Sequence, residues 1–186
     1  MKILITEPEG YAPEALAIYR RLGEVKLGLE DGARLCEEAR EAEALVVRLG
    51  FTIDAPLIRA APSLRAVVSP TTGLDHLDLE ALGAAGIEVI SLRGETAFLR
   101  SIAATGELTW ALVLAVHRRL VAAAADVRGG RWRRDPFRGR DLRGKTLGVL
   151  GVGRVGEMVA GYGRAFGMEV LGHDVRPFDA ALAEPV

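Results

Sequence analysis

The sequence has little cysteine, few aromatic residues and almost no net charge. Its one cysteine, Cys36, cannot form a disulfide within the chain and suits a reducing compartment. The net charge of −1 gives no overall field to attract nucleic acid or a membrane. No apolar run reaches the roughly 20 residues of a membrane span, and the N-terminus turns acidic too early for a signal peptide. These absences predict a cytoplasmic globular protein with no nucleic-acid or membrane partner.

Metal-binding patterns are absent as well. The sequence has 3 histidines, and their scatter along the chain, like that of Cys36, gives no ligand spacing for a metal. We therefore predict no metal site, and we expect Cys36 to contribute to the packing of a helix.

The first 92 residues alternate between strand-like and helix-like patterns. Continuous apolar strands connected by helices predict a mostly parallel sheet with helices on both faces, which is a flavodoxin-like α/β arrangement. We expect strands at residues 2–6, 24–27, 44–49, 64–69 and 88–92, and helices at 13–22, after an N-cap at Asp31, at 55–61 and at 79–85.

The rest of the chain divides into three parts. Apolar residues at every fourth position (Leu108, Leu112, Val116 and Leu120) predict one long helix over about 101–127. Residues 128–145 are irregular and rich in arginine, and residues 146–174 have the pattern of a β-α-β unit. We predict an incomplete substrate domain over 1–93, an interdomain helix and arm over 94–142, and the start of a Rossmann domain over 143–186.

The stretch TLGVLGVGRVGEMVA, residues 146–160, carries the strongest chemical signal. A strand leads into a GxGxxG turn, and a helix follows. In such a turn Gly151 permits the tight bend, Gly153 lets the backbone approach a pyrophosphate, and Gly156 lets helix and strand pack closely. The amides of Arg154 and Val155 would open the helix, where N–H groups and the helix dipole favour phosphate.

Asp174 ends the next predicted strand, about 20 residues after the turn. There its carboxylate would accept hydrogen bonds from the adenosine ribose and repel a 2′-phosphate. We therefore predict NAD rather than NADP as cofactor, although Arg176 nearby weakens that distinction. The alternative interpretation is a glycine-rich turn with no ligand, and four matching features in order favour the cofactor.

The same stretch resembles the start of the nucleotide domain in the D-isomer-specific 2-hydroxyacid dehydrogenases, particularly the branch near 3-phosphoglycerate dehydrogenase. The resemblance covers roughly residues 44–177 through three further segments: VVSPTTGLDHLDLEALGAAGIEVISLRGE, SIAATGELTWALVLAVHRRL and GGRW…FRGRDLRGKTLG. It implies an NAD-dependent oxidoreductase acting on the CH–OH group of a D-2-hydroxy acid, with a small 2-hydroxy or 2-keto acid as substrate and a homodimer as the full-length form.

The resemblance also implies roles for individual residues. Positions matching Arg154, Val155 and Asp174 bind NAD in the family. The loop matching residues 71–73 offers backbone amides to the substrate carboxylate at Thr72 and Gly73, and Thr72 can approach the cofactor. Arg48 matches a position that helps hold anionic substrates in some members, and Thr105 lies where the family lines the nicotinamide end.

Two departures from the family pattern stand out. Gly106, Gly161 and Gly163 fall inside predicted helices, where each costs about 1 kcal/mol relative to alanine. The family's substrate arginine, its histidine acid–base and the carboxylate beside that histidine match positions beyond the second strand of the cofactor domain. We therefore assign no catalytic residue and expect these 186 residues alone to be inactive.

Several residues invite a catalytic role that we do not assign. For His76 we favour a supporting hydrogen bond within its loop over proton transfer. For Asp75 and Asp78 we favour loop and helix-cap roles over a catalytic pair. His117 and His173 are expected to be structural or solvated.

Two other classes of function stay open at this point. The fold would also serve a non-catalytic, NAD-responsive binding or regulatory module. Trp132 and Phe137 among the arginines of residues 128–145 have the composition of a single-strand nucleic-acid binder. For that segment we favour an interdomain or subunit-contact arm, because the overall charge is balanced.

Overall fold

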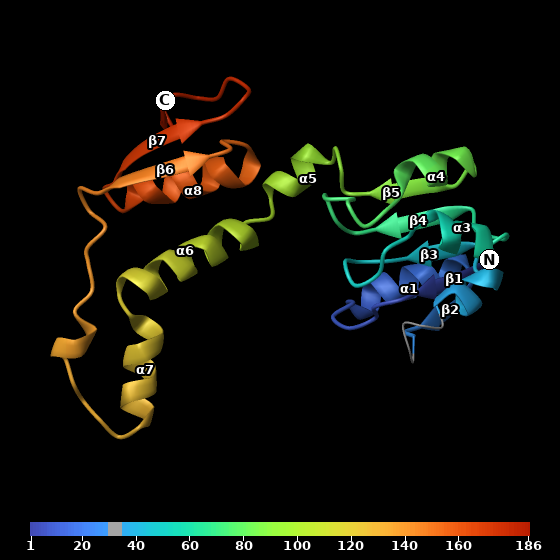
Figure 1. Ribbon diagram of the computed structural model, residues 1–186, viewed down its shortest axis with the longest axis horizontal. Helices are drawn as coiled ribbons and strands as arrows, with labels where there is room; N and C mark the ends of the chain where they lie inside the picture. The colour runs from blue at the N-terminus through green and yellow to red at the C-terminus, as the bar shows by residue number, and fades with distance from the viewer. Residues whose placement is uncertain (30–34) are drawn as a thin grey trace. The chain divides into compact units, whose positions relative to one another are not determined.

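A computed structural model describes residues 1–29 and 35–186, and the predicted N-cap Asp31 lies outside these residues. The chain forms two compact units, Met1–Thr96 and Ala97–Val186, and each is described by itself. Figure 1 shows a twisted parallel sheet in the first unit, and a smaller sheet with the helices α6–α8 in the second.

The first unit is built on five parallel strands in the order β2-β1-β3-β4-β5. Every neighbouring pair is parallel, so each connection must cross back over the sheet, and this is what the alternating sequence pattern predicted. The strands are β1 (Lys2–Ile5), β2 (Glu24–Leu27), β3 (Ala44–Val46), β4 (Ala66–Ser69) and β5 (Glu88–Ser91).

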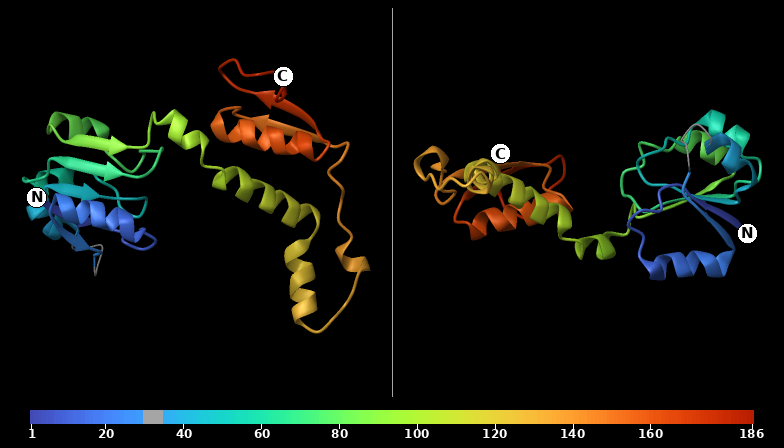
Figure 2. Two further views of the ribbon diagram at one scale, coloured as in Figure 1. Left: turned by 180° about the vertical axis from the view of Figure 1, so that it is seen from behind. Right: turned by 90° about the horizontal axis from the view of Figure 1, so that it is seen from below.

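Side-chain alternation along β1 explains why both faces of this sheet are apolar. Ile3 and Ile5 point to the face covered by α1, where Leu16 and Tyr19 pack against them. Leu4 points to the opposite face, into the larger core beneath α2, α3 and α4. Figure 2 shows α1 alone on its side of the sheet. The helices are α1 (Pro13–Leu22), α2 (Leu35–Glu38), the 3₁₀ turn η2 (Ala39–Glu41), α3 (Ala55–Ala60) and α4 (Leu79–Ala84).

Helix boundaries in this unit follow local signals. Pro13 occupies the first turn of α1, where the missing N–H costs nothing. Asp54 and Asp78 cap α3 and α4 by accepting from the backbone N–H groups of Leu57 and Ala81 at 3.0 and 2.9 Å. The predicted helix-cap role of Asp78 is confirmed. Cys36 is exposed on α2, so the expectation that it packs within a helix is wrong.

The second unit contains three parallel strands in the order β6-β7-β8, with α8 between the first two. The predicted strand, glycine turn, helix and strand are all present. The tail contributes a further short strand that the sequence pattern did not indicate. The elements are α5 (Thr96–Arg100), α6 (Ala104–His117), α7 (Leu120–Arg128), the 3₁₀ turn η3 (Asp135–Phe137), β6 (Thr146–Leu150), α8 (Arg154–Ala165), β7 (Glu169–His173) and β8 (Glu184–Pro185).

The prediction of one long helix over 101–127 is wrong. Arg119 adopts a left-handed conformation (φ 51°), and the chain turns there from α6 into α7, as Figure 1 shows. The cause is non-local, because the arm crosses the end of α6: the N–H of Arg140 donates to the carbonyl of His117 at 2.9 Å. A Cβ at Gly139 would lie 2.5 Å from that carbonyl oxygen, so the crossing requires glycine.

One stretch, Thr96–His117, has the length and hydropathy of a membrane-spanning helix, and 17% of its 18-residue apolar window is buried in the structure. The structure divides it into α5 and α6, and it carries the charged residues Arg100 and Glu107. A buried core helix of a soluble protein and an N-terminal signal sequence meet the same criterion, so one such stretch is weak evidence for a membrane span. The sequence predicted no stretch of membrane-spanning length, and Thr96–His117 differs from that prediction by length and hydropathy.

Candidate functional site

The glycine turn between β6 and α8 has a separate steric reason for two of its three glycines. Gly151 has φ +87°, a region that L side chains rarely adopt. At Gly156 a Cβ would lie 2.1 Å from the carbonyl oxygen of Gly151, so only glycine lets the helix start this close to the strand. At Gly153 the nearest atom to a Cβ is Nη2 of Arg176 at 3.9 Å, which leaves the backbone approachable. This geometry fits a dinucleotide pyrophosphate.

The N-terminus of α8 offers donors but no side-chain cap. Gly153 is the N-cap residue, and its carbonyl accepts from Glu157 N–H at 2.8 Å. The first-turn N–H groups, those of Arg154 and Val155 included, have no partner inside the helix and favour an anion there. The Arg154 guanidinium donates instead to the carbonyls of Leu99 and Ile102 at 3.0 and 3.3 Å. The group that Arg154 offers to a phosphate is therefore its backbone amide.

Asp174 follows β7 directly, with its side chain 10% exposed. Its Oδ1 accepts from the backbone N–H of Arg176 at 2.9 Å, while the Arg176 guanidinium lies 3.9 Å away. The Gly151 N–H donates to the carbonyl of His173 at 2.7 Å, which joins the glycine turn to the end of β7. Asp174 is thus placed beside the turn at the carboxyl ends of two parallel strands, where α/β sheets bind ligands.

In the first unit, Arg48 follows β3 at the carboxyl edge of the five-stranded sheet. Its backbone N–H donates to Glu7 Oε2 at 2.7 Å, and its guanidinium donates to the carbonyl of Glu9 at 3.0 Å. The other oxygen of Glu7 accepts from Gly50 N–H at 3.1 Å, so one carboxylate holds the whole turn after β3. Burial raises the pKa of the neighbouring Tyr11 hydroxyl.

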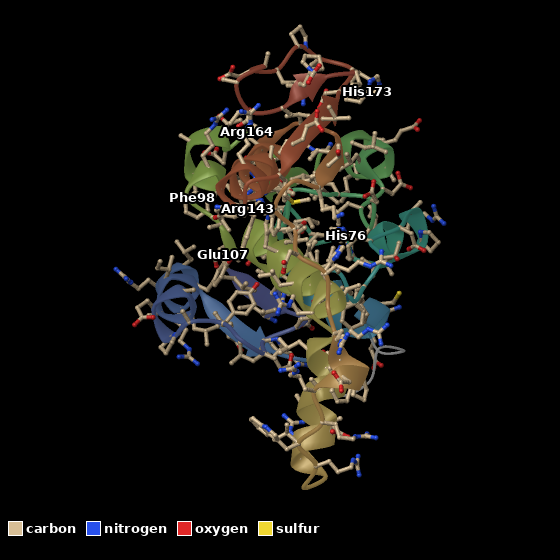
Figure 3. All side chains as sticks on the ribbon, turned by 90° about the vertical axis from the view of Figure 1, so that its left-hand side faces the viewer. His76, Phe98, Glu107, Arg143, Arg164 and His173 are labelled. Carbon is tan, nitrogen blue, oxygen red and sulfur yellow. The ribbon has the colours of Figure 1, made fainter. Side chains whose placement is uncertain are left out.

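The loop after β4 carries Thr72 and Gly73 on the same edge of the sheet, since β3 and β4 are adjacent and parallel. Both residues are exposed, and among the residues that the structure describes neither N–H donates to a protein acceptor. Two successive free amides suit a carboxylate. Below them, Ser69 Oγ lies 2.8 Å from Thr71 Oγ1 and 3.1 Å from Nε2 of His76, which is labelled in Figure 3. The predicted supporting hydrogen bond of His76 is confirmed.

Thr105 lies exposed in the first turn of α6, where its carbonyl accepts from the Thr109 hydroxyl at 2.8 Å. The next residue, Gly106, is buried against α8: a Cβ there would lie 3.2 Å from the Cβ of Met158. Trp110 Nε1 donates to the carbonyl of Val159 at 3.1 Å, and its ring stacks on Phe166 at 4.8 Å. These contacts hold α6 against α8 and so place Thr105 in the same unit as the glycine turn.

The arginine-rich arm is held by acidic partners within the second unit. Arg131 and Arg133 both donate to the carboxylate of Asp126, which is 3% exposed. These hydrogen bonds and charges lower the pKa of Asp126 to about 2. Arg138 pairs with Asp135 at 2.8 Å. Arginines engaged in this way support a structural arm.

In the part of the chain that the structure describes, the side chains of the remaining histidines are not hydrogen-bonded to the predicted site residues. His117 is exposed at the end of α6, and His173 Nδ1 lies 2.7 Å from the carbonyl of Val186. Within residues 1–29 and 35–186, no group of three or more His, Cys, Asp or Glu side chains could hold a metal ion.

Sequence reasoning missed Glu7 and Ser69 as residues that shape the candidate site, and it placed Thr71 in the loop without its hydroxyl contacts. Glu7 follows β1 closely and Ser69 ends β4, so both stand at the carboxyl edge of a parallel sheet. That edge position was the available signal. The contacts themselves depend on loops that return to the edge from elsewhere in the chain.

Comparison with known proteins identifies relatives for both units. Residues 3–127 match the family model for the D-isomer specific 2-hydroxyacid dehydrogenase catalytic domain, and residues 110–185 match that for the NAD binding domain of the same family. The chain is 36% identical over 176 residues to a D-3-phosphoglycerate dehydrogenase of Methanocaldococcus jannaschii, covering 94% of this chain and 32% of the relative. It is 44% identical over 146 residues to a glyoxylate reductase of Aeropyrum pernix, covering 75% of this chain and 42% of the relative.

Solved structures agree with these sequence matches. The TT0316 protein of Thermus thermophilus has 37% identity and a TM-score of 0.84 over 96% of this chain and 57% of its own. A D-lactate dehydrogenase of Aquifex aeolicus, complexed with NAD and lactic acid, has 27% identity and a TM-score of 0.82 over 100% of this chain and 55% of its own. The chain therefore spans about a third of the length of the first curated relative, and somewhat more than half of these solved chains.

Proposed function

Because the chain belongs to the D-isomer-specific 2-hydroxyacid dehydrogenase family, we propose that it is part of an NAD-dependent oxidoreductase acting on a D-2-hydroxy acid. Within that family we propose the phosphoglycerate dehydrogenase-like branch, which the relative from Methanocaldococcus jannaschii supports. The substrate is then a small 2-hydroxy or 2-keto acid.

The observation that carries this proposal is the glycine turn between β6 and α8. A Cβ at Gly156 would meet the carbonyl oxygen of Gly151 at 2.1 Å, and Gly151 itself has a positive φ. Both ends of the turn are therefore constrained to glycine. The N-cap residue of α8, Gly153, has no side chain, so the first N–H groups of the helix stay available as donors. That is the arrangement a pyrophosphate requires.

The residues present fit NAD. The amides of Arg154 and Val155 would hold the pyrophosphate, and Asp174 would accept from the adenosine ribose hydroxyls. Thr105 would line the nicotinamide end. When bound, NAD supplies the nicotinamide that exchanges a hydride with the substrate carbon bearing the hydroxyl.

The first unit would supply the substrate's anchor. The exposed amides of Thr72 and Gly73 would bind its carboxylate, and Thr72 would also approach the cofactor. Arg48 would add positive charge at the same sheet edge, where Glu7 and Glu9 hold it. No residue of this chain is assigned the acid–base step, and we propose that the 186 residues alone do not turn over substrate.

We retain the predicted division into a substrate domain over 1–93, an interdomain helix and arm over 94–142, and a cofactor domain from 143 on. We also propose that the full-length protein is a cytoplasmic homodimer. The support for a dimer is an apolar row on α6, where the exposed fractions are 60% for Leu108, 59% for Leu112 and 75% for Val116; Leu120, at the start of α7, is 58% exposed as well. A second copy would remove this row from water.

The test is a titration of the purified chain with NADH, followed by tryptophan emission, with NADPH as the competing ligand. Trp110 is 5% exposed and donates a hydrogen bond to the carbonyl of Val159 in α8, so its emission reports on the helix that carries the pyrophosphate site. Saturable binding that weakens at least about tenfold in Asp174→Ala, a loss of about 1.4 kcal/mol, is the expected result. The matched control is Asp179→Ala, because Asp179 is exposed and only accepts from the nearby Ala181 N–H.

Two results would contradict the proposed cofactor site. Equal weakening by Asp174→Ala and Asp179→Ala would remove the ribose assignment. No binding by a folded chain would mean that the glycine turn does not serve as a cofactor site in these residues. NADH-dependent reduction of a 2-keto acid by the chain would instead overturn its proposed inactivity. NAD-dependent capture of a partner by the full-length protein, without turnover, would favour the regulatory alternative.

A further inference from the structure

Two hydroxyl groups and one imidazole at the base of the loop of residues 70–75 form a continuous row of hydrogen bonds. His76 Nε2 lies 3.1 Å from Ser69 Oγ, Ser69 Oγ lies 2.8 Å from Thr71 Oγ1, and the Thr71 hydroxyl donates to the carbonyl of Gly73 at 2.8 Å. The row starts on one end of the loop and finishes next to the amides proposed above to bind a carboxylate.

Proton counting gives this row a direction. Each hydroxyl has one proton to donate, and a carbonyl oxygen can only accept. The Thr71 proton goes to Gly73, since otherwise two acceptors would face each other at 2.8 Å. Thr71 must then accept from Ser69, whose only proton is used there, and Ser69 must accept from His76. His76 therefore carries a proton on Nε2.

Both partners of the His76–Ser69 hydrogen bond are anchored in the fold. Ser69 is the last residue of β4 and is fully buried, so its hydroxyl must be paired to avoid a large desolvation cost. The carbonyl of His76 accepts from the N–H of Ile53 at 2.8 Å, and Ile53 is fully buried. The bond between His76 and Ser69 thus joins two fixed points and closes the base of the loop.

From this geometry we propose that His76 is a positioning residue for the substrate carboxylate. Its Nε2–H orients Ser69, Ser69 orients Thr71, and Thr71 fixes the carbonyl of Gly73 so that the amides of Thr72 and Gly73 face outward together. This inference rests on the proposed function, because it assigns His76 a task at the same carboxylate site. It requires a donor at position 76 and no change of charge.

The decisive experiment uses the whole chain labelled with ¹⁵N, with glyoxylate as the carboxylate probe. At pH about 8.5 the ¹⁵N signals of the imidazole nitrogens report the tautomer, and we expect the proton on Nε2. Glyoxylate should shift the amide signals of Thr72 and Gly73. Loss of one hydrogen bond predicts roughly tenfold weaker glyoxylate binding in His76→Ala.

Three variants separate positioning from folding. His76→Gln keeps an N–H donor and should bind glyoxylate within about threefold of the natural chain, a difference smaller than one net hydrogen bond. Ser69→Ala interrupts the row and should resemble His76→Ala. Asp75→Ala is the matched control: Asp75 is exposed in the same loop, its Oδ2 lies 3.6 Å from the Cβ position of Gly73, and its removal should not weaken binding.

The results that would contradict the role of His76 differ from those that would contradict the carboxylate site. A proton on Nδ1, or His76→Gln as weak as His76→Ala, overturns the positioning role while the carboxylate site stands. If glyoxylate shifts neither Thr72 nor Gly73 in the natural chain, the proposed carboxylate site fails and the role of His76 fails with it. NADH binding, which belongs to the other unit, should be the same in every variant, and far-UV circular dichroism, which follows both units, reports whether the first unit of each variant is folded.

Discussion

The two parallel sheets of this chain are covered to different extents. In the five-stranded sheet, apolar side chains are buried on both faces, with Leu4 and Leu45 among those on one face and Ile3 and Ile5 on the other. The three-stranded sheet has one small cluster beneath α8 and the tail, consisting of Val149, Val152, Ala160, Val170 and Ala183. Leu150, at the end of β6, is 88% exposed.

The difference in coverage indicates which interactions stabilise each unit. Burial of apolar area on two faces can hold the first sheet without help from particular polar contacts. In the second unit single contacts matter more: the bond from Trp110 to Val159, the Arg154 guanidinium on two carbonyls, and the carboxylate of Asp126. We therefore expect the second unit to be the less stable of the two.

The largest expected effect tests that ranking directly. Both tryptophans, Trp110 and Trp132, lie in the second unit, so their emission follows that unit alone, whereas far-UV circular dichroism follows both. In urea the emission should change first, and a later step should appear only by circular dichroism. Leu45→Ala, at a fully buried site of the first core, should lower the stability of that later step by about 2–5 kcal/mol.

A single transition that coincides for both probes would contradict two independently ordered units. Equally, if Leu45→Ala moved the tryptophan transition as much as the later step, the two cores would be energetically coupled.

A smaller effect compares two glycines of α8. At Gly161 a Cβ would meet nothing within 4 Å, so Gly161→Ala should stabilise the second unit by about 1 kcal/mol through helix propensity. At Gly163 a Cβ would lie 2.7 Å from Leu147 Cδ2 and 3.3 Å from Val170 Cγ2. Leu147 can rotate, but Val170 is a stiff β-branched residue in the small core.

Overpacking there costs about 1–3 kcal/mol, which offsets or exceeds the gain in helix propensity. In urea unfolding followed by tryptophan emission, the second unit should therefore be more stable in Gly161→Ala than in the natural chain. It should be less stable in Gly163→Ala than in Gly161→Ala. Equal stabilisation by both substitutions would show that α8 has room to move away from β6, and that the second core is looser than the structure implies.

The same two glycines show how far sequence reasoning reaches. Both looked like interruptions of a phosphate-binding helix, and sequence alone could not distinguish them. Only packing against Leu147 and Val170 gives Gly163 a reason. In contrast, Gly151 and Gly156 were predictable, because their reasons lie in the backbone of the turn itself.

Element prediction divides in the same way. The alternation of strands and helices in the first unit comes from local apolar patterns and from caps such as Asp78, and the parallel sheet followed from it. The prediction of one long helix was wrong because the apolar spacing continues unbroken from Leu108 to Leu120, whereas the backbone turns at Arg119. That turn depends on an arm crossing more than 20 residues later, around Gly139 and Arg140.

In the candidate site too, some residues could be predicted from local sequence and others depend on non-local contacts. Thr72 and Gly73 could be named from the sequence through a family resemblance, and in the described part of the chain both residues are exposed and neither N–H has a protein acceptor. The row from His76 through Ser69 to Thr71 depends on the loop folding back on β4. A serine at the end of a strand and a histidine in a loop are individually too common to predict it.

The smallest effect concerns the charged contact that holds α7 and the arm, which contribute no residue to the small core of the second unit. Asp126 is 3% exposed and accepts from Arg131 at 2.6 Å and from Arg133 at 3.2 Å. Hydrogen bonds from Arg133 and Arg131 lower the pKa of Asp126 from 3.8 to about 2. A depressed carboxyl pKa stabilises the folded state fully above pH 4 and loses that contribution as the pH falls towards 2.

Asp126→Asn should therefore lower the stability of the second unit at pH 7, and its difference from the natural chain should shrink as the pH falls from about 4 to about 2. Asp135→Asn is the matched control in the same arm, because Asp135 also pairs with an arginine, Arg138, but is 73% exposed. Water and salt screen an exposed pair, so this variant should change little at any pH. Tryptophan-detected unfolding across this pH range measures both. If the two substitutions had the same effect, burial of Asp126 would not matter, and the second unit would not depend on this contact.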